Sequence, residues 1–257
     1  MHWWSSCCCR NSSAAGLRSA RKSNVPTLPL LNRKHPVLLG HRGLPTIADG
    51  NTRASFMAAV EAGLDGIETD VQRTKDGVLV IHHDFVVGLR LISDMTYAEL
   101  VEQRPEMMTL EQVLELLEPY PDFLINLELK SIPGLEDGRA YELAGAVAGW
   151  SGRKRVWISS YDPVALLKIR EHRPELPLGY IFRVYDTGRM AELLGLEAVH
   201  PHWQLVTAAR VARWHRKGLR VATWTVNDAE EARRLAEMGV DVIMGDDAEA
   251  LRAARSA

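Results

Sequence analysis

The chain has 257 residues, of which 46% are hydrophobic and 25% are charged, and its formal net charge is -2 at pH 7. This length suits one α/β barrel of about 250 residues, and the weak net charge argues against a nucleic-acid partner, which usually requires a basic surface. No apolar run approaches the roughly 18 residues of a membrane-spanning helix, so we expect no stable membrane insertion. The three cysteines stand together at Cys7-Cys8-Cys9, which excludes a disulfide framework and a thiol nucleophile in the core.

The first 36 residues are expected to lie outside the folded domain. Residues 1–24 are rich in Ser, Arg, Cys and Ala and lack the continuous apolar stretch of a secretory signal, so we predict a disordered N-terminal extension and a cytoplasmic protein. Acylation of the cysteine triplet, which would tether the chain to a membrane, is the alternative. Prolines near the start of residues 25–36 predict an extended linker, because proline opposes helix formation. The domain is therefore placed at residues 37–251.

From residue 37 onward, apolar strands and amphipathic helices alternate at spacings typical of βα units. Strands are predicted at 37–40, 66–71, 123–130, 156–159, 178–182, 198–200, 220–226 and 240–244. Helices are predicted from about residue 52 and at 109–117, 141–150, 163–172, 188–194, 208–217 and 228–238. Residues 73–77 form a tight turn and residues 78–81 return along the second strand. The fold class is therefore α/β: a single (β/α)8 TIM barrel with a small β-hairpin excursion after the second strand.

Two pairs of charged residues end the second and third predicted strands. Glu68 and Asp70 are two residues apart, so both side chains point to the same face of the strand, and Glu128 and Lys130 repeat this spacing. Adjacent carboxylates repel each other unless a cation lies between them, and oxygen ligands suit a divalent ion such as Ca²⁺ or Mg²⁺. Glu68, Asp70 and Glu128 are therefore candidate metal ligands, and Lys130 is a candidate phosphate binder. The alternative is a structural cluster of ion pairs, because each spacing is common by chance.

A second group of candidates follows the first strand and the hairpin. Arg42 offers a planar guanidinium for phosphate, and Gly43 allows a sharp turn or a close approach to a ligand. His41 is suited to acid or base chemistry near neutral pH, with His83 at the end of the hairpin as its opposite partner. His82 alternates with His83 and should face away from it. Because barrel active sites form at the carboxyl ends of the strands, these groups are expected to meet at one mouth.

Other aromatic and imidazole side chains have less specific interpretations. Trp224 ends the seventh predicted strand, where it either forms an apolar wall of the pocket or simply packs in the core. The remaining histidines in the domain and linker are expected to be structural, as is usual for a single histidine in an α/β protein: His35, His172, His200, His202 and His215.

In order and spacing, these motifs resemble the signature of the glycerophosphodiester phosphodiesterase family, within the phosphatidylinositol-phospholipase-C-like barrel phosphodiesterases. The resemblance covers about residues 37–247. It is carried by His41-Arg42-Gly43, Asn51-Thr52, Ala54-Ser55-Phe56, Gly66-Ile67-Glu68-Thr69-Asp70-Val71, Thr74-Lys75-Asp76-Gly77, His83-Asp84, Thr109-Leu110-Glu111-Gln112-Val113-Leu114, Leu127-Glu128-Leu129-Lys130, Trp224-Thr225-Val226-Asn227 and Gly239-Val240-Asp241.

The resemblance implies a barrel enzyme, a phosphoric diester hydrolase, that uses a divalent metal ion. Its implied substrates are small-molecule glycerophosphodiesters, which it would hydrolyse to sn-glycerol 3-phosphate and an alcohol. By position, the resemblance implies that His41 and His83 are the acid/base pair. It implies that Glu68, Asp70 and Glu128 are the metal ligands, and that Arg42 and Lys130 bind the phosphate.

Two segments depart from the family pattern. The usual Pro-Glu-Asn-Thr before the first helix reads Asp49-Gly50-Asn51-Thr52, so Gly50 removes a carboxylate near the site. The usual Thr-Asp-X-Pro after the last strand reads Gly245-Asp246-Asp247-Ala248. The metal ligands and histidines are intact, so we expect activity and leave the preferred head group open. The loop at residues 85–95 is short beside longer relatives, which predicts an open mouth.

Two rival functions remain at this point. A phosphate-binding isomerase or aldolase would bind phosphate after the last two strands, where the acidic Gly245-Asp246-Asp247 would repel it. A non-catalytic or altered-specificity phosphate-metabolite-binding barrel is supported only by Gly50. A metal-dependent assay on a phosphodiester separates both from the hydrolase.

Overall fold

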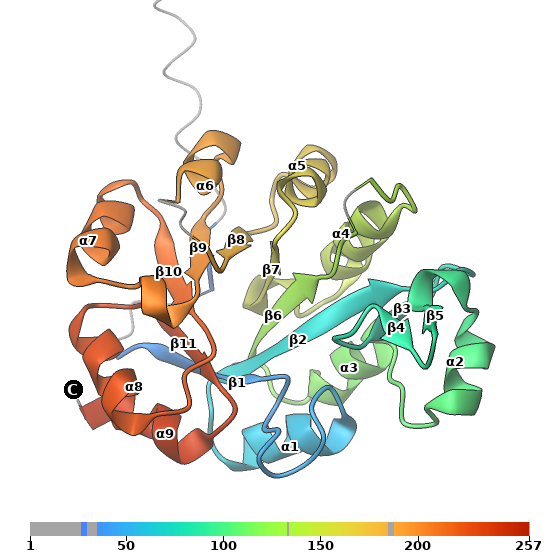
Figure 1. Ribbon diagram of the computed structural model, residues 1–257, viewed down its shortest axis with the longest axis horizontal. Coiled ribbons are helices and arrows are strands. Elements are labelled where there is room, and N and C mark those ends of the chain that lie inside the picture. Colours follow the sequence, from blue (N-terminus) through green and yellow to red (C-terminus); the bar gives the residue numbers. More distant parts are fainter. Residues whose placement is uncertain (1–26, 30–34, 133, 185–187, 257) are drawn as a thin grey trace, which may run out of the picture.

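The computed structural model describes residues 27–29, 35–132, 134–184 and 188–256, so the extension predicted at 1–24 and part of the predicted linker lie outside the described residues. Eight parallel strands in these ranges close into a barrel, because β1 (Val37–His41) pairs with both β2 (Gly66–Arg73) and β11 (Val242–Gly245). Helices surround the strands (Figure 1). The predicted TIM barrel is confirmed.

Strand order around the barrel follows the order in sequence. Between β2 and β11 lie β6 (Leu124–Leu129), β7 (Val156–Ser160), β8 (Leu178–Phe182), β9 (Ala198–Pro201) and β10 (Arg220–Thr223). The outer helices are α1 (Arg53–Glu61), α3 (Leu110–Leu117), α4 (Arg139–Gly149), α5 (Pro163–His172), α6 (Arg189–Leu194), α7 (Ala208–Arg216), α8 (Ala229–Glu237) and α9 (Ala248–Arg252). Because all eight strands are parallel, their carboxyl ends open on one face of the molecule, which we call the mouth.

The connection after β2 contains more structure than the sequence analysis expected. The hairpin excursion is present, since β3 (Leu79–Ile81) runs antiparallel to β2 with Ile81 opposite Val71. Beyond it, the loop expected at residues 85–95 forms a second hairpin, β4 (Val86–Val87) and β5 (Arg90–Leu91), and helix α2 (Tyr97–Gln103), which was not predicted, follows that loop. Thr96 begins α2 with a capping box to Glu99. Short 3-10 turns complete the described elements: Ile92–Asp94, Arg153–Arg155, Trp203–Leu205 and Ala253–Ser256.

Two predicted strand boundaries were wrong. The strand expected at 220–226 ends at Thr223, although Trp224 still forms an isolated parallel bridge with His202 and the N–H of Val226 donates to the carbonyl of Met244 in β11. The strand expected at 240–244 begins at Val242, because the N–H of Val240 still bonds to the carbonyl of Leu235 in α8. At Val240, the hydrogen bond to the preceding helix therefore overrules the apolar pattern that predicted a strand.

The core of the barrel has two parts on the two sides of the strands, and a third, smaller cluster packs the segment from β3 to α2. Outward-facing residues such as Leu38 and Ile67 pack against the helices, and inward-facing residues such as Leu39 and Trp157 fill the lower barrel. Leu28, from the predicted linker, is buried with this inner group. The domain boundaries at 37 and 251 stay a prediction. None of the helices in the described ranges is long and apolar enough to cross a membrane.

His200 is one of the inward-facing residues and is completely buried. The indole N–H of Trp157 donates to its Nε2 over 3.3 Å. Gly179 leaves room for the ring, because a Cβ at that position would lie 2.4 Å from Nε2. Burial lowers the pKa of His200 to about 3, so the imidazole is neutral at pH 7. The residue is part of the barrel core, as the structural interpretation of this histidine predicts.

The burial of His200 predicts a pH-dependent stability. Between the ordinary histidine pKa of 6.5 and about 3, the unfolded chain binds a proton that the folded chain does not. The stability that depends on a neutral His200 is therefore fully present above pH 6.5. As the pH falls below that value, the free energy of unfolding decreases by about 1.4 kcal/mol per pH unit. Between pH 7 and pH 5, the free energy of unfolding should fall by about 2 kcal/mol less in His200→Gln than in the wild type, as measured by urea unfolding. Equal losses in the two proteins would show that His200 is protonated in the fold.

Candidate active site

Strand register brings the three predicted metal ligands together at the mouth. β2 pairs with β6 so that Asp70 lies beside Glu128, and β1 pairs with β2 so that His41 lies beside Glu68. One carboxylate oxygen from each of Glu68, Asp70 and Glu128 lies within 4.8 Å of the others. Oxygens bound to one Ca²⁺ at about 2.3–2.6 Å can be separated by up to about 5 Å. The donor atoms and their spacing therefore fit a divalent cation.

Electrostatics supports the same conclusion. Burial, followed by repulsion from Asp70 and Glu128, raises the pKa of Glu68 well above its ordinary value. Burial and Asp70 also raise the pKa of Glu128. For Asp70, burial acts in the same direction, but the charges of Lys130 and Arg42 outweigh it and lower the pKa. Three clustered carboxylates thus exceed the two neighbouring cations, and an added positive charge would relieve the repulsion.

The two predicted phosphate binders lie against these carboxylates. Lys130 Nζ is 2.9 Å from Glu128 Oε1 and 3.3 Å from Asp70 Oδ1. Burial alone would lower the pKa of Lys130, but Glu128 and Asp70 raise it, so the amine stays charged. Arg42 Nε lies 3.4 Å from Asp70 Oδ2, yet it is buried and makes no hydrogen bond. Arg42 therefore retains donor capacity for an anion placed over the carboxylates.

Asn51 holds the loop between β1 and α1 against the site. Its side-chain amide donates to Asp70 Oδ2 over 2.8 Å and accepts from the hydroxyl of Thr69 over 2.7 Å. Its backbone N–H donates to the carbonyl of Arg42 over 2.9 Å. Arg42 and Asn51 have φ of 59° and 62°, left-handed values that are unusual outside glycine and are concentrated at functional sites. In the sequence, Asn51 stands out only as part of the family signature, and the cap of α1 is its neighbour Thr52.

The departure at Asp49-Gly50 leaves the carboxylate cluster with three members. Asp49 is exposed and is not part of that cluster, so it does not replace the glutamate usual at position 50. A Cβ on Gly50 would lie 3.1 Å from Arg42 Cβ and 3.4 Å from Pro45 Cγ. The loop therefore packs tightly beneath Arg42, with little room for a larger residue in this backbone position.

Each of the two candidate histidines is oriented by a carboxylate. His41 Nδ1 lies 2.7 Å from Asp246 Oδ1, and its Nε2 is 3.9 Å from Glu68 Oε2. Asn227 donates to the other oxygen of Asp246 over 2.6 Å, which fixes that carboxylate. The pairs with His41 and Asn227 lower the pKa of Asp246 despite its burial. The acidic segment after the last strand, for which the sequence predicted no contact with a catalytic residue, therefore positions His41.

His83 and His82 have different surroundings, as their alternation predicts. His83 Nδ1 lies 2.7 Å from Asp84 Oδ1. Burial lowers the pKa of His83, and the next influence is the charge of Asp70 in the carboxylate cluster. Burial also lowers the pKa of His82, but there the next influence is Arg104, near the end of α2. The charge of Asp70 in the cluster is thus a larger influence on His83 than on His82.

Aromatic side chains border the cluster on two sides. Tyr161 makes an edge-to-face contact with Trp224, at 5.9 Å between ring centroids, and the Trp224 indole donates to the carbonyl of His200 over 3.0 Å. Burial and then Glu128 raise the pKa of Tyr161, so its hydroxyl is neutral. The ring of Phe85 lies 6.0 Å from Lys130 Nζ. Neither Tyr161 nor Phe85 was predicted from the sequence: Tyr161 follows a strand that ends in no motif, and Phe85 lies just beyond the His83-Asp84 motif.

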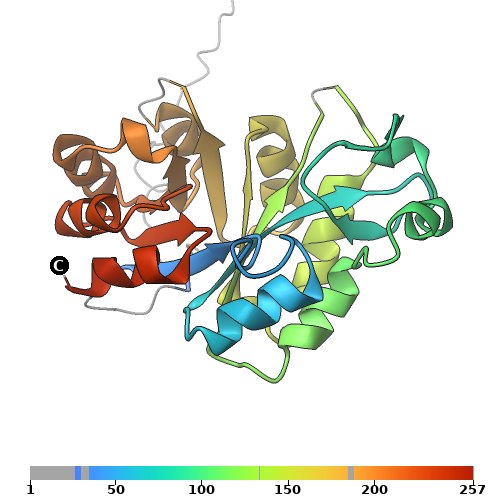
Figure 2. The same cartoon turned by 60° about the horizontal axis from the view of Figure 1, so that its bottom comes forward.

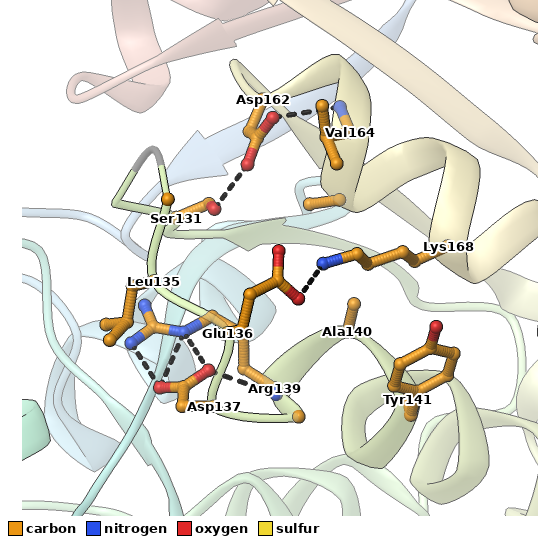
Figure 3. Close-up of a pocket in the computed structure, with 13 residues that line it drawn as sticks. Ser131, Leu135, Glu136, Asp137, Arg139, Ala140, Tyr141, Asp162, Val164 and Lys168 are labelled. Carbon is orange, nitrogen blue, oxygen red and sulfur yellow. Dashed lines mark hydrogen bonds and ion pairs between the residues drawn. The ribbon is translucent and has the colours of Figure 1, made fainter.

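A separate pocket of about 270 Å³ lies beside the loop between β6 and α4 (Figure 3). Its charged side chains pair with each other, Lys168 with Glu136 and Arg139 with Asp137. The charges of these four side chains are therefore neutralised within the pocket. The reactive groups of the described chain are therefore concentrated at the barrel mouth and not in this pocket.

The structure is a barrel with an acidic cluster, two cationic side chains and two oriented histidines at its mouth. Comparison with known proteins identifies the class of enzyme to which it belongs. The sequence model of the glycerophosphoryl diester phosphodiesterase family matches residues 41–250. A glycerophosphodiester phosphodiesterase of Caldanaerobacter subterraneus subsp. tengcongensis is 32% identical over 237 residues, which cover 84% of this chain and 96% of the relative. The chain belongs to this family of enzymes, and the sequence-based prediction of the family is confirmed.

Solved structures agree with this assignment. A phosphodiesterase of Oleispira antarctica in complex with the product sn-glycerol 3-phosphate has a TM-score of 0.79 and 26% identity, and the match covers 87% of this chain and 98% of that one. A glycerophosphodiester phosphodiesterase of Thermotoga maritima has a TM-score of 0.70 and 28% identity, covering 84% and 97%. These similarities extend over nearly the whole of each relative.

Proposed function

We propose that this chain hydrolyses glycerophosphodiesters to sn-glycerol 3-phosphate and an alcohol at the mouth of its barrel. The main support is the convergence of Glu68, Asp70 and Glu128 within 4.8 Å, in a protein of the phosphodiesterase family. The Oleispira antarctica structure, which contains sn-glycerol 3-phosphate, supports the identity of the product.

Those three carboxylates would hold one divalent cation, Ca²⁺ or Mg²⁺. A bound divalent cation supplies positive charge to the phosphate oxygens, which a diester needs because its own negative charge repels nucleophiles. Arg42 and Lys130 would bind the non-bridging phosphate oxygens, since both lie beside Asp70. Their positions are fixed before the substrate arrives, so they stabilise the developing charge without reorganisation.

His41 and His83 would share the proton transfers. One would give a proton to the leaving alkoxide, and the other would take a proton from the nucleophile, which is water or the adjacent glycerol hydroxyl. Their Nδ1 atoms face Asp246 and Asp84, so Nε2 is the nitrogen available for this exchange. Trp224 and Tyr161 would form the apolar wall against which the substrate lies. The cytoplasmic location stays a prediction.

The decisive experiment measures product release from several head groups. The purified chain would be incubated with glycerophosphocholine, glycerophosphoethanolamine and glycerophosphoglycerol, with Ca²⁺ or Mg²⁺, and sn-glycerol 3-phosphate would be measured. We expect release from at least one diester with either metal. Binding of a diester without any release would favour the non-catalytic barrel, which Gly50 alone supports.

Asp246→Asn tests the orientation of His41. The amide keeps the size of the side chain but loses the carboxylate that orients the imidazole and favours one tautomer, so kcat should fall by roughly 10²-fold or more. Metal binding measured by calorimetry should stay unchanged. Asp247→Asn is the matched control, because Asp247 caps α9 through the N–H groups of Glu249 and Ala250. It should lower stability slightly and leave kcat within about twofold. Equal kcat values for the two variants would contradict the role of Asp246.

A further inference from the structure

Strand alternation places a further charged residue, Arg183, in the mouth of the barrel. A Cβ on Gly179 would lie 2.4 Å from Nε2 of His200 in the barrel interior, so Gly179 is an inward-facing position of β8. Alternate residues of a strand face the same side, so Ile181 and then Arg183, directly after β8, continue the inward-facing positions. Arg183 was not predicted as a site residue, because no motif surrounds it in the sequence.

Arg183 belongs to a group of four inward-facing residues that follow consecutive strands, which we call the inner row: Tyr161 after β7, Arg183 after β8, His202 after β9 and Trp224 after β10. The N–H of His202 donates to the carbonyl of Phe182 over 2.9 Å, which sets Arg183 beside His202. His202 and Trp224 form a parallel bridge, and their rings meet edge to face at 5.2 Å between centroids. Since the Tyr161 ring also contacts Trp224, the inner row forms one wall of the mouth.

The inner row and the phosphate-binding groups come from different halves of the barrel. The carboxylates, Arg42 and Lys130 lie on β1, β2 and β6 or directly after them, and β8 and β9 stand opposite β1 and β2 in the closed strand order. Figure 1 and Figure 2 show β9 and β10 on one side of the barrel and the segment from β3 to α2 on the other. A phosphate held by Arg42 and Lys130 therefore has the inner row across the mouth from it.

Within the inner row, Arg183 is the residue that carries a charge at pH 7. Burial and then Arg183 lower the pKa of His202, so its imidazole is neutral. Burial and Glu128 raise the pKa of Tyr161, and Arg183 opposes them, which agrees with a place between the two rings. Arg183 is exposed, and its guanidinium makes no hydrogen bond or ion pair with the other residues that the structure describes. Its donors are therefore available to a ligand.

We propose that Arg183 selects the head group of the substrate by charge, and that it favours leaving alcohols with an anionic group over those with a cationic group. This inference rests on the proposed function, because it concerns the leaving alcohol of the same hydrolysis. Glycerol is uncharged and common to all the substrates, so a fixed cation can discriminate between them only through the head group. The rings of Tyr161 and Trp224 would by themselves suit a quaternary ammonium group, and the charge of Arg183 beside them repels it.

Three diesters of sn-glycerol 3-phosphate, similar in shape and different in charge, test this selection. Their leaving alcohols are choline, which is cationic, its neutral analogue 3,3-dimethylbutanol, and the anionic 3-hydroxypropanoate. We expect the wild type to have its highest kcat/KM with the anionic diester and its lowest with the choline diester. Arg183→Gln should reduce the ratio of these two values about tenfold, mainly through KM, because one charge attracts one head group and repels the other. Hydrolysis of the neutral diester should stay within about twofold.

Two further substitutions and a control separate charge from structure. Arg183→Lys should keep the wild-type order of the three diesters, and Arg183→Glu should reverse it. The control is Arg216→Gln, which also removes one exposed positive charge. Arg216 ends α7, and because the outer helices run antiparallel to the strands, this end lies away from the mouth. The control should show the wild-type preference for all three diesters.

Failure of the head-group selection and failure of the proposed function give different results. Hydrolysis of the three diesters with the same preference in the wild type and in Arg183→Gln would overturn the role of Arg183 and leave the function intact. A wild-type preference for the choline diester would overturn that role as well. If no diester were hydrolysed, the proposed function would be wrong, and calorimetric titration of the three diesters into the metal-loaded protein would still decide the selection. Tighter binding of the anionic diester that is lost in Arg183→Gln would support it, and equal binding would contradict it.

Discussion

Glu68→Gln should lower turnover by about 10³-fold and weaken the binding of Ca²⁺ or Mg²⁺, because the amide keeps the shape of the side chain and removes one of three ligand charges. The control is Glu111→Gln. Glu111 is exposed on α3 and is not part of the carboxylate cluster. It should behave as the wild type. Calorimetric titration with each metal reports binding independently of turnover, and full hydrolysis by the wild type in excess chelator would contradict a metal site.

The same substitution has a second, thermodynamic signature. The pKa of Glu68 is raised by burial and by its carboxylate neighbours, so ionised Glu68 destabilises the metal-free fold at pH 7. A raised pKa means that this carboxyl contributes stability at low pH, and that the contribution is lost as the pH rises through the folded pKa. Glu68→Gln should therefore unfold at higher urea concentration than the metal-free wild type at pH 7. Saturating metal should reverse this order, since the cation stabilises the intact cluster.

Replacement of either histidine should also produce a large loss. His41→Ala and His83→Ala are each expected to lower turnover by about 10²–10⁴-fold, the usual contribution of an acid or base. His82→Ala is the control, because Arg104 and not the carboxylate cluster is the main charge near that ring. It should retain most of the activity. An essential His82 beside a dispensable His83 would show that the side chains after β3 are assigned one residue out of register.

A substrate with a good leaving group assigns the two roles. Nitrophenolate leaves without a proton, so a diester of nitrophenol should largely restore turnover in the variant that lacks the acid. The variant that lacks the base should remain slow with both substrates. Comparison of the two alanine variants on the two substrates therefore identifies which of His41 and His83 protonates the leaving group. If the nitrophenyl substrate rescued neither variant, the histidines would act by another route.

Local patterns in the sequence were sufficient for the elements that carry the site. The spacing of Glu68 and Asp70 put both carboxylates on one face, since strand geometry repeats every two residues. The helix predicted at 109–117 begins with a capping box between Thr109 and Gln112, a signal readable from the sequence because the contact spans a single helical turn. The similar signal at Thr96 and Glu99 marks α2 and could have been used. The order of strands also followed from sequence, because βα units close a barrel in chain order.

Only the tertiary structure decided how distant groups act on one another. Asp246 and His41 are 205 residues apart, and their contact converts an acid expected to repel phosphate into the residue that orients a histidine. The left-handed backbone of Asn51, which brings its amide to Asp70, also depends on the loop packed around it. Tyr161 joins the site from a strand without a motif. Charge and orientation at a site depend on neighbours in space, and local periodicity contains no information about those neighbours.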